Sequence, residues 1–88
     1  MTYSIEFTEE AESDFAFILR ANRRLARRML AKIESLGASP RTGKPLVGNH
    51  KGEFSLRVGS YRIVYQLDTV RHILYVLTIK HRKNVYRY

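Results

Sequence analysis

Two arginines that flank a glycine–serine pair are the residues of this sequence best suited to bind an anion. Arg57 and Arg62 lie in two runs of alternating apolar and polar residues joined by Gly59 and Ser60, and glycine at the first position of a two-residue loop is typical of a type II′ hairpin turn. This turn places the arginines opposite each other, with Cβ atoms only ~5 Å apart, so that their charges repel. A phosphate, whose oxygens match planar guanidinium groups, would relieve that repulsion. The alternatives are that both side chains extend into water or that one pairs with an acid such as Glu53.

The C-terminal nine residues, from Lys80 to Tyr88, interleave basic and aromatic side chains without apolar periodicity. A site that binds phosphates and stacks on bases needs both kinds of residue. His81, Arg82 and Tyr86 are therefore candidates for proton transfer, charge stabilisation and stacking. A solvated basic terminus would have the same composition, and this simpler interpretation stays open.

The charge of the chain is large and unevenly distributed. Lys and Arg number 16 against 8 Asp and Glu, so the net charge is +8 in 88 residues. Five of the acids lie in the first fourteen residues, which leaves the rest of the chain more basic than the total indicates. The excess favours a polyanionic partner, either nucleic acid or an acidic protein, over a merely solubilising surface.

Two helices are expected after a short N-terminal strand. Residues 3–7 alternate apolar and polar side chains, as in a half-buried strand, and Thr8 is a suitable N-cap for the first helix. The second helix should run from near Asn22 to before Gly37. The residues expected on the apolar stripes are Ala11, Phe15, Ile18 and Leu19 in the first helix and Leu25, Met29, Ile33 and Leu36 in the second.

Four arginines of the second predicted helix lie off its apolar stripe. They are Arg23, Arg24, Arg27 and Arg28. Two of them fall in the first turn, where the helix dipole disfavours cations. Helix stability therefore does not explain them, and they are candidate contacts for an acidic partner.

Three strands are expected in the C-terminal half. Residues 38–52 hold two prolines and three glycines and are predicted to form an irregular connection. The strands follow at Glu53–Val58, Tyr61–Asp68 and His72–Ile79, and the last should be central because both its faces are apolar. In the hairpin, six apolar side chains share one face through the pairs Val58–Tyr61, Leu56–Ile63 and Phe54–Tyr65. The order β-α-α-β-β-β predicts a single α+β domain over residues 1–88, with two N-terminal helices packed on a small, mostly antiparallel twisted sheet.

Composition excludes several kinds of site. The chain has no cysteine, so disulfides and thiolate metal sites are absent, and the histidines His50, His72 and His81 are scattered, so we expect neither metal nor cofactor. The longest apolar run, Ile73–Leu77, is far shorter than the ~18 residues that span a membrane. The N-terminus lacks the features of a signal peptide. We therefore expect a cytoplasmic protein without membrane contact.

Three segments together resemble the RelE/ParE toxin superfamily of type II toxin–antitoxin systems. They are residues 45–48 (PLVG), residues 52–65 (GEFSLRVGSYRIVY) and residues 79–86 (IKHRKNVY). The predicted order of helices and strands agrees with that family as well, so the resemblance covers nearly the whole chain. RelE-like members imply a toxin that enters the ribosomal A site, cleaves messenger RNA without a metal ion and is neutralised by a cognate antitoxin. The resemblance implies contact with operator DNA only through the antitoxin complex.

The resemblance also assigns roles to individual residues. Arg62 matches the arginine that contacts the scissile phosphate, and Arg57 matches the arginine of the preceding strand. Arg82 and Tyr86 match the C-terminal arginine and tyrosine of the family, and His81 stands where many relatives carry a histidine. Candidate contacts with RNA, the ribosome or the antitoxin are Arg23, Arg24, Arg27, Arg28, Lys51, Lys80 and Lys83.

One departure from the family leaves the general base open. Some RelE members carry two lysines on the strand before the hairpin, and the matching residues here are Glu53 and Ser55. Glu53, His81, Tyr86 or the nearby Lys51 could take the base role. Two other functions stay open: a ParE-like toxin that inhibits DNA gyrase, and a non-catalytic RNA-binding module.

Overall fold

The computed structural model describes residues 2–48 and 52–85, and for Asn84 and Val85 the backbone alone. The elements, in chain order, are β1 (Ser4–Phe7), α1 (Glu9–Ala21), α2 (Arg23–Ser35), β2 (Lys44–Pro45), β3 (Glu53–Val58), β4 (Tyr61–Asp68), β5 (Ile73–His81) and α3 (Arg82–Val85). The predicted α+β class and the order of its main elements are confirmed. The short β2 and α3 were not predicted.

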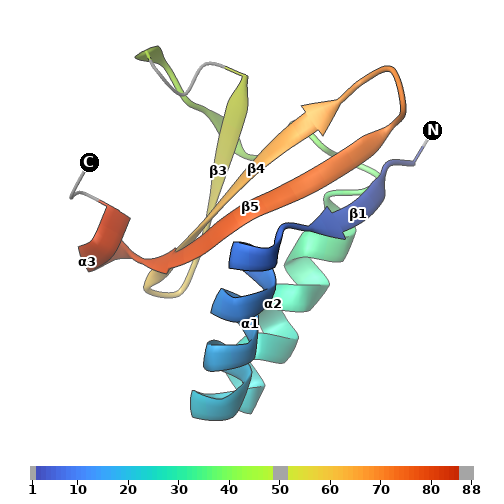
Figure 1. The fold of residues 1–88 in the computed structure, drawn as a ribbon. Helices are drawn as coiled ribbons and strands as arrows, with labels where there is room; N and C mark the ends of the chain where they lie inside the picture. Colours follow the sequence, from blue (N-terminus) through green and yellow to red (C-terminus); the bar gives the residue numbers. More distant parts are fainter. Residues whose placement is uncertain (1, 49–51, 86–88) are drawn as a thin grey trace.

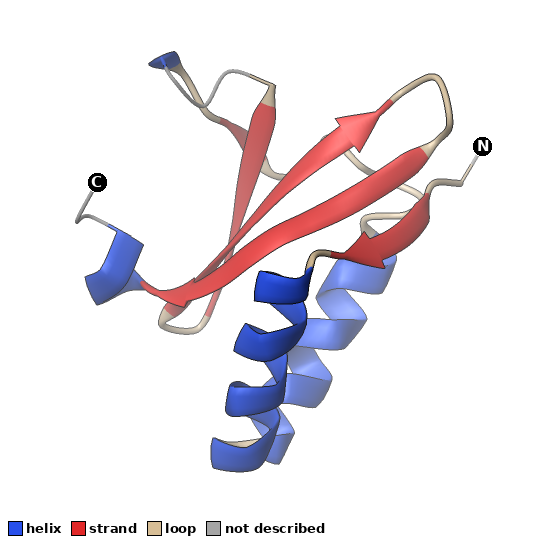
Figure 2. Ribbon diagram, in the orientation of Figure 1, coloured by secondary structure: helices blue, strands red, loops and turns tan. Residues whose placement is uncertain are grey.

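The strands form one mixed sheet in the order β1-β5-β4-β3-β2. β1 runs parallel to β5, and the other neighbours are antiparallel. β5 is thus an inner strand, as its apolar faces predicted, although β4 occupies the middle of the five. Helices α1 and α2 lie side by side against one side of the strongly twisted sheet, and α3 follows the far end of β5 (Figures 1 and 2).

The first long helix begins at the predicted cap, Thr8, and the second begins near Asn22 as predicted, with Asn22 as its cap. The Thr8 hydroxyl accepts from the Ala11 N–H at 3.1 Å, and the Asn22 side chain accepts from the Leu25 N–H at 3.1 Å. Asn22 has an extended backbone and ends α1 as well as starting α2, so the two helices are joined by a single residue.

The apolar stripe of α1 is narrower than predicted. Ala11 and Ile18 are buried, and Phe15 packs against the core from its edge. Leu19 is 41% exposed, so its assignment to the stripe is wrong. Leu19 lies one residue, or about 100°, beyond Ile18 around the helix, past the surface that the sheet covers. In α2, Met29 and Ile33 are buried as predicted and Leu25 partly so, and Ala26 is buried as well. Leu36, the C-cap residue of α2, is also buried as predicted.

The β3–β4 hairpin has the predicted register. Its pairs include Val58 with Tyr61 and Arg57 with Arg62. Gly59 has a φ of +60°, the conformation that the first position of a type II′ turn requires and that glycine adopts without steric cost. Because alternate residues face opposite sides, the hairpin turn fixes which residues meet the helices.

The two faces of the sheet carry different side chains. We call the side packed on α1 and α2 the covered face; its core residues are Leu56, Val58, Ile63, Tyr65, Leu74, Val76 and Ile79. We call the other side the open face; its residues on β3, β4 and β5 include Glu53, Ser55, Arg57, Arg62, Val64, Gln66, Tyr75, Thr78 and Lys80. The helices α1 and α2 leave the open face uncovered (Figure 1).

Strand β5 contains a bulge, and its bounds differ from the prediction by one or two residues at each end. Val64 pairs with Thr78, but the next residue, Tyr65, pairs with Val76, so the register skips Leu77. This extra residue keeps Ile79 on the covered face opposite Ile63.

The segment predicted to be irregular is held to the sheet by Tyr65. Its buried hydroxyl donates to the Pro40 carbonyl oxygen at 2.7 Å and accepts from the Gly43 N–H at 2.9 Å. Burial raises the pKa of the Tyr65 hydroxyl. A Cβ on Gly43 would lie only 2.5 Å from that hydroxyl, so glycine is required for the close approach. This anchor allows Lys44 and Pro45 to pair with Ser55 and Phe54 as β2.

Candidate functional site

The predicted arginine pair lies on the open face in one cross-strand row. Arg57 is opposite Arg62 on β4, and Arg62 is opposite Lys80 on β5. Arg57 is exposed, and Arg62 is half-buried. The structure therefore brings together the two guanidinium groups that the sequence suggested would bind a phosphate, next to the turn of the hairpin.

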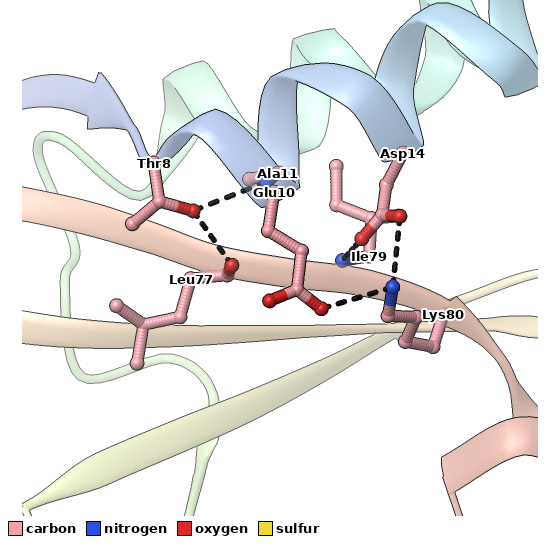
Figure 3. Close-up of polar contacts among 7 residues, drawn as sticks. All are labelled: Thr8, Glu10, Ala11, Asp14, Leu77, Ile79 and Lys80. Carbon is pink, nitrogen blue, oxygen red and sulfur yellow. Dashed lines mark hydrogen bonds and ion pairs between the residues drawn. The ribbon is translucent and has the colours of Figure 1, made fainter.

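The third cation of this row, Lys80, is engaged by two carboxylates of α1. Its ammonium nitrogen lies 2.9 Å from Asp14 Oδ1 and 3.0 Å from Glu10 Oε2 (Figure 3). Hydrogen bonds to Asp14 first, and then to Glu10, raise the pKa of Lys80 above its usual value. Lys80 was a candidate RNA, ribosome or antitoxin contact; in this structure its charge is largely balanced by α1.

Helix α1 takes the place of a neighbouring strand along the end of β5. The strand β1 pairs with β5 only as far as Val76. Beyond it, the Thr8 hydroxyl donates to the Leu77 carbonyl oxygen at 2.7 Å, and Asp14 Oδ2 accepts from the Ile79 N–H at 3.0 Å (Figure 3). These side chains satisfy backbone groups that an exposed sheet edge would leave to water.

His81 lies on the covered face and not beside the two arginines. It is the cross-strand partner of Tyr61, and the two rings meet edge to face with centroids 5.3 Å apart. Its Nδ1 accepts from the Lys83 N–H at 3.3 Å. Both rings line a hollow of about 330 Å³ between α1 and the end of β5, together with the exposed Phe17. His81 is thus separated from Arg57 and Arg62 by the thickness of the sheet.

Arg82 lies at the junction of β5 and α3, beside the hairpin turn. Its N–H donates to the Ser60 carbonyl oxygen at 2.8 Å, which ties the start of the C-terminal segment to the turn between the two arginines. The side chains of Arg82 and Lys83 are exposed. Two other candidates, Tyr86 and Lys51, lie outside the described residues.

The four arginines of α2 are all exposed. Arg28 lies beside the hairpin turn, because a Cβ on Gly59 would be 3.6 Å from its guanidinium nitrogen. Arg23 and Arg24 are the first two residues of α2, next to its junction with α1, where Arg20 is exposed as well.

The described part of the chain contains neither a metal-binding group nor a membrane-spanning helix. Residues 2–48 and 52–85 hold no group of three or more His, Cys, Asp or Glu side chains that could bind a metal ion. In the same ranges, none of the helices is long and apolar enough to cross a membrane.

Asp14 and Glu10 are functional-site neighbours that sequence reasoning missed. Each lies on α1, and Asp14 meets Lys80 across 66 positions of the chain. Glu10 lies in the first turn of α1, where the helix dipole is a sufficient local explanation, and Asp14 lies beyond that turn and has no distinct local signal. Only the path of α1 along β5 shows that they also hold the strand.

The sequence is similar to known toxins. A sequence model of the ParE toxin of type II toxin–antitoxin systems matches residues 5–86. Toxin RelG of Mycobacterium tuberculosis is 33% identical over 93 residues, covering 99% of both chains. The chain belongs to the RelE/ParE toxin family.

Solved structures of relatives agree with this assignment. The RelBE2 toxin–antitoxin complex of M. tuberculosis contains a chain that is 30% identical, with a TM-score of 0.82 over 93% of this toxin and 100% of that chain. The YoeB/ParE toxin of Agrobacterium tumefaciens has the same fold, with a TM-score of 0.80 over 89% of this toxin and 96% of that chain, at 23% identity. This toxin is accordingly the toxin component of a type II system with the RelE-like fold.

Proposed function

We propose that this toxin is a metal-independent endoribonuclease that cleaves messenger RNA in the ribosomal A site and so inhibits translation and growth. The observation that carries the proposal is the cross-strand pair Arg57–Arg62 on the open face. Two guanidinium groups fixed on adjacent strands provide charge and paired donors for a phosphate. RelE-family toxins are typically ribonucleases, which supports the same activity.

The reaction needs few protein groups. The ribose 2′-hydroxyl attacks the adjacent phosphorus, a bond from O2′ to phosphorus forms, and the bond from phosphorus to the 5′-oxygen breaks. Arg57 and Arg62 stabilise the negative charge that develops on the phosphate oxygens, a contribution typically worth ~10²–10³ in rate. A base must take the proton of the 2′-hydroxyl, and an acid must protonate the leaving 5′-oxygen.

The candidate bases differ in their position relative to the arginines. Glu53 shares the open face with them and lies four residues, or about 13 Å, from Arg57 on the same strand, so its carboxylate and the arginines must extend toward the same nucleotide. His81 faces the other way. We propose Glu53 as the first residue to test, with Tyr86 and Lys51 as the next candidates. The N–H of Arg82 is hydrogen-bonded to the hairpin turn, which favours contacts of Arg82 and Lys83 with RNA beside the scissile phosphate. Tyr86 is a further candidate contact from the sequence.

The experiment is a short pulse of expression followed by mapping of mRNA 5′ ends, with a supercoiling assay of DNA gyrase on the same cells. We expect new 5′ ends within translated reading frames and normal supercoiling. The alternative function is gyrase inhibition, favoured by the match to the ParE toxin model. Intact transcripts with inhibited gyrase would replace our proposal by that alternative. Intact transcripts, normal gyrase and no growth arrest would instead indicate a non-catalytic RNA-binding module.

We further propose that an acidic cognate antitoxin binds the exposed arginines of α2 and neutralises the toxin, and that operator DNA is contacted through that complex. The RelBE2 relative was solved as such a toxin–antitoxin complex. Charge attraction of this kind raises the association rate more than it slows dissociation. An association rate that does not fall with added salt would contradict this proposed contact between the antitoxin and the α2 arginines.

Because translating ribosomes are the proposed target, the toxin would act in the cytoplasm.

A further inference from the structure

The open face carries one aromatic side chain among the described strand residues, Tyr75 of β5. Its neighbours Leu74 and Val76 are fully buried on the covered face, so Tyr75 points to the other side of the sheet. Tyr75 is half-buried. A tyrosine ring on a sheet face that no long helix covers offers a flat surface to a partner.

The row that contains Tyr75 has the opposite electrostatic character to the arginine row. Tyr75 is paired with Gln66 on one side and Glu6 on the other, and Gln66 is paired with Glu53. The exposed carboxylate of Glu6 disfavours a phosphate in this row. It favours an uncharged group that has hydrogen-bond donors, and the exposed Gln66 amide can both donate and accept. A nucleobase stacked on the ring has these properties.

The row of Arg62 and the row of Tyr75 are far enough apart for one RNA strand to contact both with different groups. From Arg62 to Gln66 the strand β4 advances four residues, or about 13 Å. The row between them holds Ser55, Val64 and Thr78, and beside it the side chain of the bulged Leu77 points away from α1 (Figure 3). A chain lying along the strands would pass over this uncharged row and its leucine, and would place a phosphate and a base at its two ends.

We propose that Tyr75 is a base-stacking residue, which holds one nucleobase of the mRNA while Arg57 and Arg62 hold the scissile phosphate. The inference rests on the proposed ribonuclease function and adds a substrate subsite to it. Proteins that bind single-stranded RNA commonly stack bases on tyrosine rings exposed on a sheet. The Gln66 amide beside the ring is placed to hydrogen-bond the edge of the same base.

A cycle that combines a protein variant with an altered RNA tests the subsite. Ribosomes are programmed with mRNAs in which each position around the A-site codon is made abasic in turn, and single-turnover cleavage is measured. We expect Tyr75→Val to slow cleavage of intact mRNA about tenfold and Tyr75→Phe, which keeps the ring, to stay within about twofold of wild type. At one position, removal of the base should slow the wild-type toxin about tenfold as well. On that abasic mRNA, Tyr75→Val should cleave at the same rate as the wild-type toxin.

The control is Tyr3→Val, which removes a half-buried tyrosine that packs against the core and should slow intact and abasic mRNAs by the same factor. An unchanged rate for Tyr75→Val on intact mRNA overturns the stacking role, and so does an equal loss on every abasic mRNA. Circular dichroism checks that the variants fold. If both Tyr75→Val and Tyr75→Thr unfold, the ring is structural and the inference is wrong. Failure of the wild-type toxin to cleave any programmed mRNA would instead refute the proposed function itself.

Discussion

The covered and open faces of the β3–β4 hairpin are built from alternate residues of the same two strands, yet they differ in burial and in charge. On the covered face Val58 and Ile63 are almost completely buried. On the open face, each one residue away, Arg57 and Arg62 carry like charges in adjacent positions. Repulsion between two solvated charges at this range is on the order of 1 kcal/mol, while each buried aliphatic side chain contributes ~1.5–3 kcal/mol.

The comparison shows how a small domain holds two like charges on adjacent strands. The period of two in a β-strand lets the covered face provide the stability, so the open face is left for binding. Substitutions on the covered face should therefore change mainly the free energy of unfolding, and those on the open face mainly activity. Four variants, ordered from the largest expected effect to the smallest, test that separation.

The largest effect is expected on the covered face. Ile63→Ala should lower the free energy of unfolding by ~2–5 kcal/mol, because it removes a fully buried side chain and leaves a cavity. Urea unfolding followed by circular dichroism measures the change. Val64→Ala, on the adjacent residue of the open face, is the matched control and should cost less than half as much. Equal losses would show that both faces support the core.

A loss of activity without loss of stability is expected from the neighbouring arginine. Arg62→Ala should slow mRNA cleavage ~10²–10³-fold by removing charge stabilisation of the phosphate, while unfolding changes by less than ~1 kcal/mol. Growth arrest and single-turnover cleavage report the first quantity, and urea unfolding the second. Arg71→Ala, an exposed arginine in the β4–β5 turn, should leave both unchanged. A folded Arg62→Ala protein with full toxicity would contradict the ribonuclease site.

A smaller loss of stability is expected where a covered-face residue anchors a loop. Tyr65→Phe keeps the ring but leaves the Pro40 carbonyl and the Gly43 N–H without their partner, at a cost of ~1–3 kcal/mol. The denaturant midpoint measures it. Tyr75→Phe, on the open face, should leave the midpoint unchanged. An unchanged denaturant midpoint for Tyr65→Phe would show that water replaces the hydroxyl.

The smallest effect is expected at Lys80, an exception on the open face because its ammonium group is held by α1. Its side chain is 28% exposed, and solvent screens its ion pairs. Lys80→Met should cost less than ~1 kcal/mol at pH 8. Since the links to Asp14 and Glu10 raise the pKa of Lys80 above 10.5, this stabilisation is complete below pH 10.5 and is lost as the pH rises through the raised pKa. The stability difference from wild type should therefore shrink above pH 11, whereas Lys83→Met should show no difference at either pH.

Local patterns were enough to predict much of the fold. The Thr8 cap, the start of the second helix near Asn22, the Gly59 turn and the alternation on either side of it each depend on a few residues, and the structure agrees with all of them. The turn also fixed the Arg57–Arg62 pairing, so the centre of the candidate site followed from one hairpin. Its catalytic role stays a prediction.

What could not be predicted depends on contacts between distant parts of the chain. The strand β2 has only two residues and exists because Tyr65 holds the preceding loop. The balance of charge at Lys80 depends on α1 lying along β5. His81 was a candidate from the composition of the tail and from the resemblance, and the bulge in β5 decides that Lys80 faces the side of the arginines and His81 does not. Each of these relations depends on a distant contact or a strand irregularity, which leaves no periodic signal in the sequence.

The bulge at Leu77 shifts the alternation of side chains along β5 by one residue. Up to Val76, one set of alternate residues faces the helices; from Ile79 onward the other set does. The extra residue is what returns an isoleucine to the core and presents Lys80 on the side of the arginines. A chain lacking Leu77 would keep both faces with a regular ladder. A chain lacking one residue between the bulge and Lys80, with the bulge intact, would exchange the faces of Lys80 and His81 and bring an imidazole beside Arg62. Relatives that differ by a single deletion in this stretch could thus gain or lose a proton-transfer group without any substitution.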